Sequence, residues 1–154
     1  MKYLIAISFT LVIAAFAIGD TCESSKGNFC NVRVVKVYDG DTITVNIKDL
    51  PSVFGSKISV RIRGIDTAEI RGRNHCEKTA ARTARKLVEN LVKNGKTIHL
   101  LKVERDKYFR LLADVSIDGK MVRDVLLKNR LAVAYEGKSK ERVDWCKRIP
   151  ASKE

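Results

Sequence analysis

Segment 58–65 alternates apolar and polar side chains, and this alternation restricts it to one kind of structure. Ser59, Arg61 and Arg63 occupy every second position, with mostly apolar residues between them. Successive side chains of a β-strand point to opposite faces, so such a strand has one apolar face and one cationic face. The segment therefore predicts a strand that covers a core, and it ends in the polar turn 66–69.

Other segments show either the same alternation or helical spacing. Further strands are expected at 32–37, 42–47, 97–103 and 111–117. A helix is expected from about 77 to 92, because small and apolar residues recur there at helical spacing. Shorter helices are expected at 122–129 and 139–147. This order predicts a β-rich α+β fold: a five-stranded, partly closed barrel of the OB type with two to three packed helices.

The first 17 residues have the pattern of a secretory signal peptide. Lys2 precedes an apolar run that ends near Ile18, and Ala15-Phe16-Ala17 has small residues where a cleavage site needs them. An uncleaved membrane anchor is the alternative, but the run is slightly short for a full span. We expect an exported protein, extracellular or periplasmic, with a signal peptide at 1–17, an arm at 18–31, one domain at 32–147 and a tail at 148–154.

All four cysteines lie beyond the expected cleavage site. An even number in an oxidising compartment suggests two disulfides, for which three pairings are possible, and free thiols are the alternative. We favour a local clasp, Cys22 with Cys30, and a longer link, Cys76 with Cys146. A zinc site is disfavoured, because the chain has no Cys-x-x-Cys pair and its two histidines are far apart in the sequence.

The chain is strongly basic, with 30 Lys and Arg against 18 Asp and Glu and a net charge of +12. Lys and Arg occur in the expected strands, helices and loops and are not confined to a tail, which suits nucleic acid, anionic lipid or heparin-like sugar, with nucleic acid as the first choice. An ordinary solvated surface is the alternative. A membrane-active protein is poorly supported, because the mature chain has no strongly apolar amphipathic segment.

Carboxylates follow or precede the expected strands at Asp41, Asp66 and Glu69. With no histidine or thiolate nearby, they favour a hard cation with oxygen ligands, calcium ahead of magnesium or manganese. Phosphodiester hydrolysis uses carboxylates to hold a metal or activate water, and guanidinium groups to stabilise phosphate charge. Arg61 is equally compatible with a structural ion pair, and the acids with a solvated surface.

Downstream, Lys107 and Tyr108 could contact a phosphate and stack on a base, although an ordinary solvated loop would have the same composition.

Three sequence blocks resemble the signature blocks of the thermonuclease, or staphylococcal-nuclease-like, family. They are Val37-Tyr38-Asp39-Gly40-Asp41-Thr42, Arg61-x-x-x-x-Asp66-Thr67-x-Glu69 and Asp106-Lys107-Tyr108-x-Arg110, in the family's order and spacing. The resemblance covers roughly 32–135. It implies an OB-fold, calcium-dependent endonuclease that cleaves DNA and RNA and leaves 3′-phosphate ends. Little sequence specificity is expected, because no segment has the pattern of a groove-inserting recognition helix. A monomer is the default expectation, without stable membrane association once the signal peptide is cleaved.

The resemblance also implies roles for individual residues. One calcium ion would be held by Asp41, Asp66 and the carbonyl of Thr67. The catalytic positions would be Arg61, Glu69 and Arg110. The substrate contacts would be Lys107, Tyr108 and Tyr135. The alternative is a non-catalytic OB-type module that only binds nucleic acid, but a pure binder would be free to lose the catalytic-type residues that this chain keeps.

The chain departs from the family pattern at a few positions. Ala68 replaces a proline and Phe109 replaces a glycine, changes that bear on how Glu69 and Arg110 are aimed. The tail is shorter than in the best-known member. Cys76 and the pair Trp145-Cys146 resemble a bacterial branch of the family with a disulfide at that place.

Overall fold

A computed structural model describes residues 22–25, 27–106, 108, 110–138 and 142–148. The expected signal peptide, most of the expected tail and Lys107 lie outside these residues.

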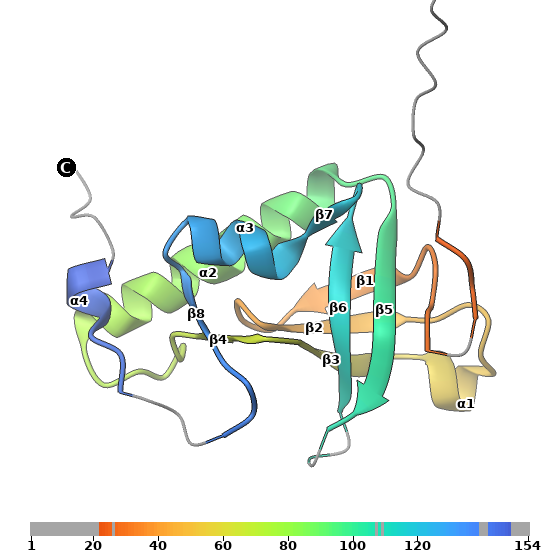
Figure 1. Ribbon diagram of the computed structural model, residues 1–154, viewed down its shortest axis with the longest axis horizontal. Coiled ribbons are helices and arrows are strands. Elements are labelled where there is room, and N and C mark those ends of the chain that lie inside the picture. Colours follow the sequence, from red (N-terminus) through yellow and green to blue (C-terminus); the bar gives the residue numbers. More distant parts are fainter. Residues whose placement is uncertain (1–21, 26, 107, 109, 139–141, 149–154) are drawn as a thin grey trace, which may run out of the picture.

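The main sheet is curled and mixed (Figure 1). Its strands follow the order β1 (Arg33–Val37), β2 (Thr42–Asn46), β3 (Ile58–Ile62), β6 (Leu111–Ile117) and β5 (Ile98–Arg105), with the two-residue β7 (Lys120–Met121) beside β6. Neighbouring strands are antiparallel except β3 and β6, which run parallel. All five expected strands are therefore present.

The arm before β1 closes this sheet toward a barrel. Phe29 and Leu100 exchange two backbone hydrogen bonds, of 2.8 and 2.9 Å, so the arm pairs with β5. The N–H of Val32 also donates to the carbonyl of Ile98 over 2.9 Å. Hydrogen bonding around the curled sheet thus passes from β1 through the arm to β5, as an OB-type barrel requires.

The third strand is shorter than its sequence pattern suggests. It ends at Ile62, and the chain turns at Gly64, whose φ of 80° is readily adopted only by glycine. The next strand, β4 (Ile65–Thr67), pairs with β8 (Ala132–Ala134) in a second, two-stranded sheet. Asp66 and Thr67 therefore lie inside a strand, and not in a turn beyond the third strand as expected.

The described residues contain four helices, two of them longer than one turn. The long helix α2 (His75–Asn94) begins at Asn74, whose side chain accepts a hydrogen bond from the N–H of Glu77, and it lies beside α3 (Val122–Lys128) in Figure 1. The single-turn helices are α1 (Ser52–Gly55), between β2 and β3, and α4 (Trp145–Arg148), at the end of the expected 139–147 helix.

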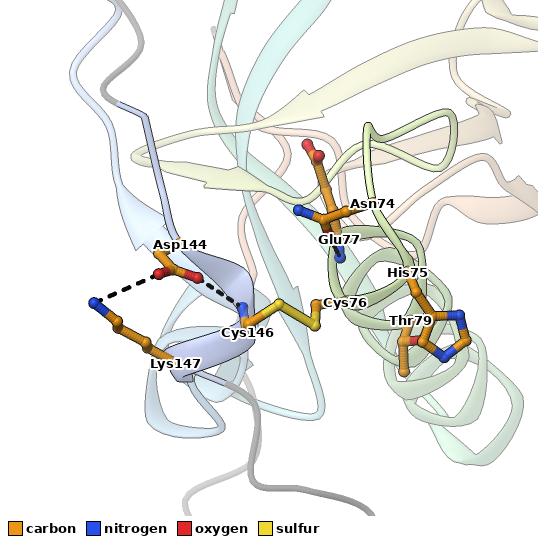
Figure 2. The surroundings of a disulfide bond; sticks show 8 residues. All are labelled: Asn74, His75, Cys76, Glu77, Thr79, Asp144, Cys146 and Lys147. Carbon is orange, nitrogen blue, oxygen red and sulfur yellow. Dashed lines mark hydrogen bonds and ion pairs between the residues drawn. A yellow bond between two sulfur atoms is a disulfide. The ribbon is translucent and has the colours of Figure 1, made fainter.

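Two disulfides are present, Cys22–Cys30 on the arm and Cys76–Cys146 between α2 and α4. These are the two pairs favoured from the sequence. Figure 2 shows the second disulfide, which joins the first turn of α2 to α4 beside the carboxylate of Asp144. Within the described residues, no helix combines the length and the apolar composition needed to cross a membrane.

Candidate active site

Asp41 lies in the tight turn between β1 and β2, and Gly40 allows this turn to approach its neighbours closely. A Cβ atom at position 40 would lie 2.7 Å from the Cβ of Ala84 on α2 and 2.9 Å from the Cγ2 of Thr67 on β4. Real Cβ atoms essentially never approach other atoms that closely. A glycine is therefore required for the turn to reach both elements, and Asp41 is buried as a result.

Three hydrogen bonds from two threonines hold the carboxylate of Asp41. Its Oδ2 accepts from both the backbone N–H and the hydroxyl of Thr67, each over 2.9 Å. Its Oδ1 accepts from the hydroxyl of Thr42 over 3.0 Å. The carboxylate is thus connected to β2 and to β4, and its orientation is set by both sheets.

Arg61 projects from β3, where it is paired in register with Thr42 of β2. Its guanidinium contacts the carboxylate of Asp41 and also that of Asp66, the latter over 2.9 Å. Burial lowers the pKa of Arg61, and the charges of Asp66 and Asp39 oppose that shift. The two carboxylates that the resemblance assigns to metal binding therefore converge on one cationic group.

Asp39 is a further carboxylate of the site; it belongs to the first signature block, but it was assigned no role of its own from the sequence. It lies at the start of the same turn, and its Oδ1 accepts a hydrogen bond from the N–H of Asp41 over 3.1 Å. Burial raises the pKa of Asp39, against the opposing charge of Arg61. The sequence feature that could have identified Asp39 as a site residue is its position two residues before Asp41. An aspartate before glycine is also an ordinary turn residue, so this feature is weak.

Arg110 is held in place by Asp106, a second residue that was not assigned a role. The Nε of Arg110 donates to Asp106 Oδ2 over 2.8 Å, and its guanidinium carbon lies 5.4 Å from the centre of the Tyr108 ring. Burial would raise the pKa of Asp106, but hydrogen bonds from Arg110 and Tyr108 lower it below its ordinary value. The charged loop between β5 and β6 is therefore organised around one carboxylate.

One cavity of about 740 Å³ brings these groups together. Of the residues proposed from the sequence, it is lined by Asp41, Arg61, Asp66, Thr67, Glu69, Tyr108, Arg110 and Tyr135. It is also lined by residues that were assigned no role from the sequence, among them Tyr38, Asp39, Thr44, Ser59 and Asp106. Lys107 lies outside the described residues.

Ala68, which stands where the family pattern has proline, is buried in a small cluster separate from the main core. The cluster contains Ala80 and Ala81 of α2 and Trp145 of α4. Packing against two helices therefore holds the segment between Thr67 and Glu69, and the Cys76–Cys146 disulfide joins those helices. Trp145 thus packs beneath the segment that leads to Glu69.

The donor atoms at the convergence of Asp41 and Asp66 suit a hard cation. Both side chains offer carboxylate oxygens, and both already pair with the guanidinium of Arg61, so this part of the site favours positive charge. The peptide of Thr67 lies against Asp41 through its N–H. Among the described residues, the one close cluster of three metal-ligating side chains is Cys22, Cys30 and His99, and its cysteines are joined in a disulfide.

Comparison with known proteins agrees with this fold and site. Residues 59–152, more than half of the chain, match the family described as Staphylococcal nuclease homologue. The chain belongs to this family, which confirms both the resemblance drawn from the three blocks and the OB-fold class.

Three bacterial relatives are named as endonucleases. The chain is 39% identical over 124 residues to Endonuclease YncB of Bacillus subtilis, covering 76% of this chain and 54% of that protein. It is 40% identical over 112 residues to the SPbeta prophage-derived endonuclease YokF of the same species, covering 68% and 34%. It is 30% identical over 130 residues to an uncharacterized endonuclease of Haemophilus influenzae, covering 84% and 65%. The chain thus spans less than two thirds of the length of each of these relatives.

Proposed function

We propose that this protein is an exported, calcium-dependent endonuclease that hydrolyses phosphodiester bonds of DNA and RNA. The observation that carries the proposal is that one cavity is lined by Arg61, Arg110 and Glu69 together with Asp41 and Asp66, the two carboxylates that pair with Arg61. Metal-assisted phosphodiester cleavage uses this combination of cationic groups, a base and a cation-binding pair. The names of the relatives support the same activity.

Arg61 and Arg110 would stabilise the charge that develops on the phosphoryl oxygens. Both guanidinium groups line the cavity, and both are held by carboxylates, Arg61 by Asp41 and Asp66, and Arg110 by Asp106. Fixed donors aimed at growing negative charge lower the barrier without having to reorganise during the reaction. The two arginines are therefore the cationic groups that would bind the phosphate in the proposed site.

Glu69 would accept the proton of the attacking water. It is exposed and lines the cavity, so water reaches its carboxylate, while the packed Ala68 next to it fixes the backbone. A general base needs an ionised carboxylate within hydrogen-bond distance of that water. On the family resemblance we propose that the 5′ oxygen leaves, which gives 3′-phosphate ends.

Asp41, Asp66 and the carbonyl of Thr67 would hold one calcium ion. When bound, the ion would neutralise phosphate charge and lower the pKa of nearby water. Calcium takes six to eight oxygen ligands, so waters and phosphate oxygens would supply the rest. Magnesium and manganese are weaker candidates, because magnesium demands a nearly ideal octahedral site.

Substrate recognition would depend on charge and stacking, with little sequence preference. Tyr108 is 65% exposed and lines the cavity together with Tyr135, and we also propose Lys107 as a phosphate contact. The net charge of +12 would add non-specific phosphate contacts, so affinity should fall as salt rises. The two disulfides are compatible with an oxidising compartment, which supports export, and we propose a monomer.

Glu69→Gln is the substitution that tests the proposal. We expect cleavage of plasmid, single-stranded DNA and RNA to fall by about 100-fold or more, because a general base contributes about 10²–10⁴-fold. Binding of a labelled oligonucleotide and the melting temperature should change little. Glu89→Gln is the matched control, since Glu89 lies on α2 in an exposed pair with Arg85.

Undiminished cleavage by Glu69→Gln would remove Glu69 from the mechanism. A wild-type protein that binds nucleic acid in a salt-dependent manner, but cleaves none with or without calcium, would instead support the non-catalytic OB-type module.

A further inference from the structure

Two exposed tyrosines stand on opposite sides of Arg61, and each has a cation near its ring. Tyr108 belongs to the loop that leads into β6, and Arg110 lies 5.4 Å from its ring centre. Tyr38 follows β1, is 54% exposed, and has the ammonium of Lys36 5.6 Å from its ring centre. Both tyrosines line the cavity. The Tyr38–Lys36 pair has no place in the function proposed above.

The sheet register places Tyr38 on the same row as Arg61. The N–H of Tyr38 donates to the carbonyl of Thr42 over 2.9 Å, and Thr42 is paired with Arg61 on the next strand. Strands in a sheet lie about 4.8 Å apart, so Tyr38 is about 10 Å from Arg61 across the sheet. A base on Tyr38 would therefore belong to a nucleotide that flanks the one whose phosphate contacts Arg61.

Lys36 lies on the neighbouring row of the same sheet face. It is paired in register with Thr44, which is paired in turn with Ser59, and both of these residues line the cavity. The row that leads from Lys36 to the cavity therefore carries the hydroxyl groups of Thr44 and Ser59, which can donate to phosphate. Asp39 is the acidic group at this rim, and Arg61 lies near enough to offset its charge.

We propose that Tyr38 and Lys36 form an additional nucleotide-binding subsite for single-stranded nucleic acid on the β1 side of the cavity. Tyr38 stacks on a base and Lys36 contacts an adjacent phosphate, in the same combination of ring and cation that Tyr108 and Arg110 offer on the β6 side. A base must be unstacked from its neighbours to lie on a tyrosine, so the subsite selects single strands over duplex. This inference rests on the proposed function only in taking nucleic acid as the substrate.

Binding of fluorescein-labelled oligothymidylates to the Glu69→Gln protein tests the subsite without cleavage. Oligomers of two and of eight nucleotides are compared by fluorescence anisotropy. We expect Tyr38→Ala to weaken binding of the eight-nucleotide strand about 10-fold or more, because stacking on one aromatic residue contributes that much. Binding of the two-nucleotide strand, which occupies only the central site, should change less than 2-fold.

Further variants separate stacking from bulk and from charge. Tyr38→Phe keeps the ring and should bind like the parent, whereas Tyr38→Leu keeps apolar bulk and should bind as weakly as Tyr38→Ala. Lys36→Ala should reduce the slope of log affinity against log salt concentration by the amount expected for about one lost phosphate contact. Phe54→Ala is the matched aromatic control, since Phe54 is 68% exposed on α1 and does not line the cavity.

The proposed subsite would be wrong if Tyr38→Ala and its parent bound the eight-nucleotide strand with equal affinity. It would also be wrong if Tyr38→Ala lost affinity by the same factor for the two-nucleotide and the eight-nucleotide strands. Cleavage by the protein with Glu69 intact is measured in parallel. If the protein with Glu69 intact cleaves nucleic acid, but Tyr38→Ala binds the eight-nucleotide strand as tightly as its parent, the subsite is wrong and the proposed function is not affected. If it cleaves nothing and the length-dependent loss is present, the proposed function fails and the subsite stands.

Discussion

Thr67 donates its backbone N–H and its hydroxyl to the same oxygen of Asp41, each over 2.9 Å. Asp41 belongs to the turn before β2 and Thr67 to β4, so the two hydrogen bonds join the main sheet to the small one. The orientation of the Asp41 carboxylate is therefore decided by contacts between segments that are 26 residues apart.

Replacing the Thr67 hydroxyl by a methyl group should loosen this carboxylate. We expect Thr67→Val to lower the free energy of unfolding by about 1.5–3 kcal/mol, the usual loss for a buried hydrogen bond to a charged group. The calcium concentration for half-maximal cleavage should rise about 10-fold, as for other groups that orient a metal ligand. Thr67→Ser keeps the hydroxyl and is the control; an equal calcium requirement in both variants would count against the role of this hydrogen bond.

Adding one methyl group at Gly40 should force the Asp39–Asp41 turn away from α2 and β4. The new Cβ would lie 2.7 Å from Ala84 Cβ, and such overpacking costs about 1–3 kcal/mol. Urea unfolding of Gly40→Ala should show that loss together with reduced cleavage. The double variant with Ala84→Gly should lose less stability than the sum of the single variants, because the nearest clash is relieved. Strict additivity would mean that this contact does not limit the turn.

The two disulfides should differ in how much they stabilise the fold. Cys76–Cys146 closes 70 residues and Cys22–Cys30 closes 8, so loop entropy predicts about 4.4 and about 2.5 kcal/mol respectively. We expect Cys76→Ser with Cys146→Ser to unfold at lower urea than Cys22→Ser with Cys30→Ser. The double variant Cys76→Ser with Cys146→Ser should also have a lower kcat, because Trp145 of α4 packs against Ala68, next to Glu69. Equal kcat in both double variants would show that α4 does not position this segment.

Removing calcium should change stability as well as activity. Calcium that binds the folded chain alone raises the melting temperature by mass action, so EGTA should lower it and abolish cleavage. In Asp66→Asn, calcium and EGTA should change neither the melting temperature nor the cleavage activity. Asp124→Asn should keep both responses, since Asp124 is an exposed residue of α3 outside the cavity. If the melting temperature of the parent protein were the same with and without calcium, that result would argue against the proposed metal site.

Much of the fold could be predicted because its signals are local. The alternation in 58–65 marks a strand whatever it pairs with, and the spacing of apolar residues marks α2. The three signature blocks similarly supply the groups of the site, among them Asp41, Arg61 and Arg110. These patterns determine which side chains share a face, and they do so within a few residues of chain.

Other features depend on contacts between distant segments, and only the tertiary structure decided them. The pairing of Ile65–Thr67 with Ala132–Ala134 moved Asp66 and Thr67 from an expected turn into a strand. The burial of Ala68 against Trp145, and the anchoring of Arg110 by Asp106 within a loop, have no periodic signal in the sequence.

The same holds for Tyr38. From the sequence it is one aromatic residue before an Asp-Gly turn. In the structure its N–H donates to the carbonyl of Thr42, which is paired with Arg61, so Tyr38 lies in line with Arg61. The physical reason is that periodicity is read along the chain, whereas a site is assembled across strands. The residue types and their faces follow from local spacing, but which groups meet depends on the register and packing that the folded chain alone establishes.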